Sequence, residues 1–216
     1  VFYKRNGQFS TGRYALKGTL GQCIMYPPER EMDGSFPFVL YNLGGGICNL
    51  VCSCLAILLF WFFEEISIRI TLGLFAVIGL IAAMDNLIPR KAYAQNDGMN
   101  LKCLLRSDTC RESFYLQLQV NAEMSEGKSI IDYPVDRFSI SQDSEESEVM
   151  LAPVRLMEYY RFLALKEFTS AKEVLTGLEK NNRKYVPGIF YMIELEKFFL
   201  MLIERRPTQE IAAVYK

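Results

Sequence analysis

The chain has 216 residues, 50% of them hydrophobic, and its 24 Lys and Arg almost balance 25 Asp and Glu. The net charge of −1 gives no basic surface for nucleic acid, and the length allows one or two domains with a core or membrane spans. The chain contains no histidine, which limits the metal sites that it can build alone.

The six cysteines indicate small apolar side chains rather than disulfides or a metal site. No pair has the CxxC spacing, and three of the six lie in one apolar segment. We therefore expect reduced thiols. The sequence begins at Val1 and shows no signal peptide, so we expect it to be the downstream part of a longer protein.

Residues 1–37 predict a β-rich segment next to a membrane. Asn6-Gly7 lies between two short β-prone runs and accepts the positive φ angles of a hairpin turn. Residues 14–26 are candidates for further strands, which Pro27-Pro28 ends. An acidic loop containing Gly and Pro, residues 29–37, leads to the first apolar run.

Two apolar runs predict a transmembrane helical hairpin within residues 38–98. The first run, 38–63, has no charged residue before Glu64, and the second, 66–88, is nearly as long. At about 1.5 Å per residue, each run reaches across about 30 Å of hydrocarbon. The Lys and Arg residues that flank the hairpin place both of its ends in the cytoplasm. A pair of buried helices in a soluble domain is the alternative.

The remaining sequence predicts a cytosolic part. We expect an amphipathic helix over 99–120, an acidic linker over 121–153 and a helical domain over 154–216. Within the last segment, Tyr160-x-x-Leu163-Ala164 followed by Phe168-x-x-Ala171 resembles one tetratricopeptide-type helix pair, which suggests a cytosolic protein as its partner. The predicted fold is a mostly α-helical, multi-pass protein of the cell membrane. It has a short N-terminal β hairpin, a transmembrane hairpin and a cytoplasmic C-terminal helical domain.

Polar and small residues share one face of the first apolar run. Asn42, Gly45, Asn49 and Cys52 follow one another at helical spacing. The glycine lets another helix approach closely, and Gly45-x-x-x-Asn49 sets an amide one turn deeper. This face can form part of a site or can only pack helices, and the sequence leaves both open.

The end of the second run places a carboxylate beside the membrane. Pro89 ends the helix, and Asn86 is positioned to bond the backbone groups that the proline releases. Asp97 follows, and Gly98 permits a tight turn after it. Asp97 can bind a cation, accept a proton or N-cap the helix that begins near Met99. Ligand and cap are equally open at this point.

Gly45-x-x-x-Asn49 in one span, Asn86-x-x-Pro89 in the next and then Asp97-Gly98 together resemble the second half of the catalytic core of site-2 proteases, the intramembrane zinc metalloproteases. The resemblance extends over about residues 14–105 and is to bacterial members with a cytosolic helical tail. This chain departs from the family pattern in the longer stretch between Pro89 and Asp97.

The resemblance implies a zinc-dependent intramembrane metalloendopeptidase. In that family an upstream helix carries His-Glu-x-x-His, with two histidines on zinc and the glutamate as general base. The aspartate of the Asp-Gly motif is the third zinc ligand, and here it is Asp97. Asn49 and Asn86 are implied to line the catalytic face and to steady the substrate or the transition state. The implied supporting residues are Gly45, Pro89 and Gly98.

Without histidine, this chain alone is expected to be inactive, with His-Glu-x-x-His upstream of Val1. The implied partners are the lipid bilayer and a membrane protein or peptide substrate, which the N-terminal β segment receives by strand addition. Two other functions stay open: a non-catalytic, membrane-anchored scaffold whose helical tail binds a cytosolic partner, and a small transporter subunit. We also expect Asn49 and Asp97 to share one side of the hairpin and to face a groove for a missing helix.

Overall fold

The computed structural model describes residues 2–5, 8–11, 26–31, 36–141, 148–205 and 207, and these are mostly α-helical. The α-helices of the described residues are α1 (Phe38–Phe62), α2 (Ile66–Leu87), α3 (Asp97–Arg106), α4 (Asp108–Ser125), α5 (Glu148–Ala164), α6 (Phe168–Glu179) and α7 (Pro187–Ile203). Short 3-10 helices are η1 (Ile130–Asp132), η2 (Val135–Phe138) and η3 (Asn182–Lys184).

At the N-terminus two strands, β1 (Phe2–Arg5) and β2 (Gln8–Thr11), pair antiparallel, with Phe2 opposite Thr11. The predicted turn at Asn6-Gly7 and nearly all of the predicted strand region 14–26 lie outside the described residues.

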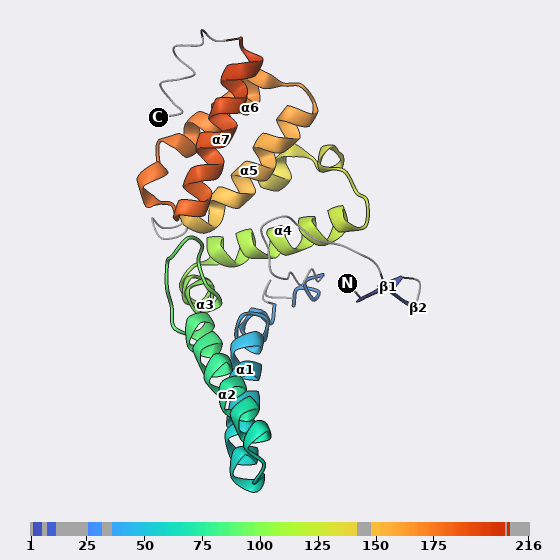
Figure 1. Cartoon of the computed structure of the whole chain (residues 1–216). Coiled ribbons are helices and arrows are strands. Elements are labelled where there is room, and N and C mark those ends of the chain that lie inside the picture. Colours follow the sequence, from blue (N-terminus) through green and yellow to red (C-terminus); the bar gives the residue numbers. More distant parts are fainter. Residues whose placement is uncertain are drawn as a thin grey trace.

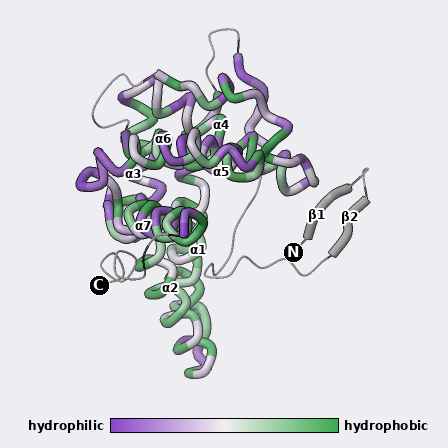
Figure 2. The backbone as a smooth tube through the Cα atoms, turned by 90° about the horizontal axis from the view of Figure 1, so that it is seen from above, coloured by the Kyte–Doolittle hydropathy of each residue, from purple (hydrophilic) through white to green (hydrophobic). Residues whose placement is uncertain are grey.

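Helices α1 and α2 form a long antiparallel hairpin that projects away from the other helices (Figure 1). Both are long and apolar enough to cross a membrane. Large apolar side chains cover the outside of the hairpin: Phe62 is 81% exposed and Leu40 is 74% exposed. Figure 2 shows the corresponding hydrophobic colouring along both helices. The side chains buried in the hairpin are small or polar, namely Asn42, Ser53, Ala56, Ala76 and Ala83.

This distribution is typical of helices surrounded by lipid, because small residues permit close helix contact when the outer surface has no need to be polar. Gly79 of α2 lies against Ser53 of α1 so closely that a Cβ at Gly79 would lie 2.2 Å from the Ser53 hydroxyl oxygen. That hydroxyl donates to the carbonyl of Asn49 over 2.7 Å, which satisfies it within its own helix.

Helices α3 and α4 adjoin the open end of the hairpin, where α1 begins and α2 ends (Figure 1). Phe36, just before α1, and Tyr41 in its first turns pack against Phe114 of α4, with ring centroids 6.5 and 5.6 Å from that of Phe114. The single helix that we predicted over 99–120 is two helices. The break falls at Ser107, whose hydroxyl accepts from the Cys110 N–H over 3.0 Å and so caps α4.

Helices α5, α6 and α7 form the C-terminal helical domain around a shared apolar core. Its fully buried members include Tyr159, Ala171, Leu178 and Ile193. The predicted boundary was wrong here, because α5 begins at Glu148 rather than at Val154. An acidic run and Pro153 suggested a linker, but the structure buries the Glu148 carboxylate.

Candidate metal-ligand site at the open end of the hairpin

Residues 88–96 connect α2 to α3, and Asn96 closes the base of this loop, which we call the Asp97 loop. The Asn96 amide donates to the carbonyl of Asp85 over 2.5 Å and to that of Ile88 over 2.6 Å. Its oxygen accepts from the N–H groups of Arg90 and Met99 over 2.9 and 3.0 Å. Asn96 therefore satisfies the last carbonyls of α2 and a first donor of α3 at once.

Two sequence interpretations are wrong at this point. The backbone groups that Pro89 leaves free are bonded by Asn96, eleven positions after Asp85, and not by Asn86. Asn96 is also the N-cap of α3, so Asp97 is its first helical residue and not its cap. The sequence did offer a signal, because Asn precedes Asp97 directly and asparagine is among the best N-cap residues.

Gly98 brings the first turn of α3 against the end of α2. A Cβ at Gly98 would lie 2.3 Å from the carbonyl oxygen of Leu87 and 3.1 Å from the nitrogen of Pro89. Both atoms belong to the backbone, so the position needs glycine for close approach rather than for the predicted tight turn. The structure thus brings the predicted supporting residues Pro89 and Gly98 into contact.

Asp97 is half-buried beside this contact. Burial raises the pKa of its carboxyl group above the ordinary value. As the first residue of α3, Asp97 lies where the helix carries partial positive charge and unpaired N–H groups. A partly desolvated carboxylate gains from a cation at its oxygen atoms, which is the chemistry that we predicted for Asp97.

The polar face that we predicted on α1 is buried to different extents along the helix. Asn42 is 1% exposed and donates to the Phe38 carbonyl over 2.8 Å, while its own oxygen has no partner among the described residues. Asn49 is half-buried, and Gly45 is exposed with no heavy atom near its Cβ position. The close approach occurs one residue later, because a Cβ at Gly46 would lie 2.6 Å from the Leu87 side chain. That Asn49 and Asp97 share one side of the hairpin stays a prediction, as does the catalytic role of Asn86.

Sequence reasoning missed a second carboxylate at the same end. Asp85, in the last turn of α2, forms an ion pair with Arg90 across Pro89. The signal was available, since Asp85 is the one acidic residue within the second apolar run. The arginine neutralises this carboxylate, whereas Asp97 forms no ion pair with the described residues at this end.

The zinc that the family resemblance implies needs a complete set of donor atoms. A catalytic zinc takes three protein ligands from His, Cys, Asp or Glu. Across the described ranges, no three such side chains gather closely enough to hold a metal. The described residues therefore do not complete a zinc site, and Asp97 as a zinc ligand stays a prediction.

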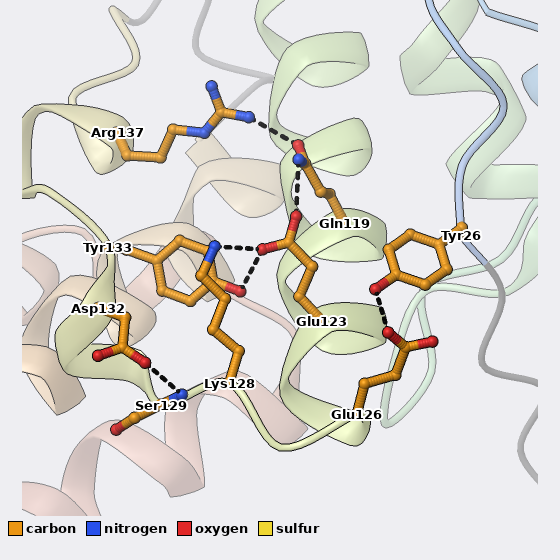
Figure 3. Close-up of polar contacts among 9 residues, drawn as sticks. All are labelled: Tyr26, Gln119, Glu123, Glu126, Lys128, Ser129, Asp132, Tyr133 and Arg137. Atoms are coloured by element: carbon orange, nitrogen blue, oxygen red, sulfur yellow. Dashed lines mark hydrogen bonds and ion pairs between the residues drawn. The ribbon is translucent and has the colours of Figure 1, made fainter. Parts of the chain in front are cut away.

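A second polar region lies at the far end of α4 (Figure 3). Glu123 accepts from Lys128, Tyr133 and Gln119 over 2.6, 2.9 and 2.9 Å. The hydrogen bond from Lys128 lowers the pKa of the Glu123 carboxyl, and burial raises the pKa of the Tyr133 hydroxyl. Arg137 donates to Gln119 beside a shallow cleft of about 680 Å³. These groups satisfy one another, so the region fastens η1 and η2 to α4.

No known protein family, curated protein or solved structure matches the chain. The fold and the site alone therefore define the class of this protein. It is mostly helical and has two helices apolar enough to span a membrane. A half-buried carboxylate lies where those helices meet the helices that follow.

Proposed function

We propose that this protein is the C-terminal part of a membrane-embedded zinc metallopeptidase of the site-2 protease type, which hydrolyses peptide bonds of membrane-proximal substrates. The observation that carries the proposal is the placement of Asp97. Its carboxyl group is half-buried in the first turn of α3, against the broken end of α2, and this turn is fixed by Asn96 and Gly98.

The outer surface of the hairpin supports a position in the bilayer. Leu40, Leu58 and Ile78 are each more than half exposed, and burying such side chains in lipid stabilises them by about 25 cal/mol per Å² of apolar area. Both ends of the hairpin then lie on the cytoplasmic side, and so does the C-terminal helical domain.

Each residue has a defined task in the proposed reaction. Asp97 would supply one protein ligand to the zinc, and two histidines of an upstream helix would supply the others. When bound, zinc supplies an acidified water for attack on the peptide carbonyl. Asn49 and Asn86 are proposed to hold the substrate strand with their amides, and β1 or β2 is proposed to pair with its extended backbone.

The test is a zinc and cleavage measurement on the product of the complete gene. Asp97→Ala is expected to abolish both bound zinc and the cleavage of a membrane-proximal reporter. The chain offers a matched control in Asp108, which is the first residue of α4 as Asp97 is of α3 but is exposed and paired with Arg111. Asp108→Ala is expected to keep both the bound zinc and the cleavage of the reporter. Full zinc content in Asp97→Ala would refute the proposed role.

One observation favours a second function, that of a membrane-anchored scaffold. Leu195 and Leu202 share a face of α7 and are 64% and 48% exposed, although both are apolar. Such a face is suited to a cytosolic protein partner. If the coding sequence upstream of Val1 contains no apolar helix with His-Glu-x-x-His, the scaffold function replaces the peptidase.

A further inference from the structure

The tip of the Asp97 loop touches the C-terminal helical domain. The loop folds back on itself, with Lys91 bridged to Gln95 and the Asn96 N–H donating to the Arg90 carbonyl over 3.3 Å. Its tip at Tyr93 therefore extends away from the base that Asn96 closes. This tip reaches the first turn of α7, almost one hundred residues later in the chain.

The contact at the tip uses both backbone and ring. The Gly188 N–H donates to the Tyr93 carbonyl over 2.8 Å. The Tyr93 ring stacks on Tyr191 with centroids 6.4 Å apart and planes inclined by 21°. A Cβ at Gly188 would lie 2.9 Å from the Tyr93 carbonyl oxygen and 3.1 Å from the edge of its ring, so only glycine fits there without displacement.

The first turn of α7 needs this contact because it has no cap of its own. Its N-cap residue is Val186, which has no polar side chain, and Pro187 has no N–H group. The next N–H belongs to Gly188, and the Tyr93 carbonyl accepts it in place of a capping side chain. Loop and helix therefore stabilise each other, and α7 cannot shift without moving the loop.

From this geometry we infer that the C-terminal helical domain positions Asp97, with Tyr93 as the positioning residue through which α7 holds the Asp97 loop. The path is continuous: α7 fixes the tip, the folded loop carries the constraint to its base, and Asn96 passes it to the first turn of α3. Its meaning for catalysis rests on the proposed function, whereas the mechanical link does not. A displacement of α7 would then loosen the carboxylate without touching it.

The test compares amide exchange in variants of the complete gene product in detergent micelles. Gly188→Val is expected to speed exchange of the Arg90, Asn96 and Met99 amides by roughly tenfold, because the loop loses its anchor. Gly177→Val is the matched control, since Gly177 of α6 has open space at its Cβ position. Tyr93→Ala is expected to act like Gly188→Val, while Tyr93→Phe keeps the stacked ring and the slow exchange. Unchanged exchange in Gly188→Val and Tyr93→Ala would overturn the inference.

Zinc release provides the readout that a merely structural contact would not change. Gly188→Val is expected to release zinc about tenfold faster than the Gly177→Val control, with equal helicity in the two proteins. Faster loop exchange with unchanged zinc release, in a protein whose zinc depends on Asp97, would overturn the positioning role. If Asp97→Ala retains all its zinc, the proposed function fails separately, and faster exchange in Gly188→Val would still support the link between α7 and the loop.

Discussion

Replacement of Gly98 by alanine tests the close contact that places Asp97. The new Cβ would lie 2.3 Å from the Leu87 carbonyl oxygen, against an ordinary contact distance of about 3.5 Å. Helix α3 and the end of α2 must therefore separate by about 1 Å. The Asn96 hydrogen bonds tie both sides of the contact, so they resist this separation.

The expected loss of stability follows from two opposing effects. Overpacking against backbone costs about 3 kcal/mol at the upper end of its usual range. Alanine in place of glycine within a helix returns up to about 1 kcal/mol. The net destabilisation of about 2 kcal/mol lowers Tm by about 4–8 °C in a chain of this size.

The assay is thermal melting in detergent micelles, followed by circular dichroism at 222 nm. Gly45→Ala is the control, because Gly45 is also helical but has no heavy atom within 4 Å of its Cβ position. We expect its Tm to be unchanged or slightly higher. A Gly98→Ala protein that melts at or above the wild-type temperature would show that the backbone contact at Leu87 does not constrain α3.

Three further predictions use the same melting assay. Asn96→Ala is expected to lose about 2 kcal/mol of stability through the cap and the released carbonyls, and Asn96→Asp about half of that, since it keeps only the acceptor; equal Tm values for the two variants would contradict the four-bond arrangement. Burial raises the pKa of the Asp97 carboxyl group, so the folded state binds more protons than the unfolded state, and the stability falls as pH rises through that pKa. Asp97→Asn should therefore be more stable than wild type at pH 7 and equal to it below about pH 4. Glu148, fully buried, accepts from Tyr185 and Asn181 over 2.7 and 3.0 Å, so Glu148→Ala is expected to cost about 3 kcal/mol, and a loss below about 1 kcal/mol would refute its anchoring role.

The elements that local sequence predicted correctly were those with a long apolar run or with a proline at the end of a helix. Two apolar runs predicted α1 and α2 almost to the residue, because continuous hydrophobicity over more than twenty positions has few other outcomes. Pro89 predicted the end of α2 because it lacks the N–H that the next turn requires. The described cysteines carry reduced thiols, as expected from their spacing.

The sequence failed where a polar residue bonds to a group far from it in the chain. Glu148 was predicted to lie in an acidic linker, but its partners Tyr185 and Asn181 lie more than thirty residues away in the chain. The sequence analysis assigned no role to Asn96, although its side chain closes the loop back to Asp85. Such bonds depend on how the elements pack, which local hydrophobicity and residue propensity do not determine.

By itself, the sequence determined the chemical type of the candidate ligand and the membrane-like hairpin that precedes it, because both depend on residue identity and on local hydrophobicity. The tertiary structure decided where that carboxylate lies and what holds it. Gly98 meets Leu87, and Tyr93 meets Gly188, through backbone contacts across separate elements. The distances between those backbones arise only when the helices pack, so they are a property of the folded chain as a whole.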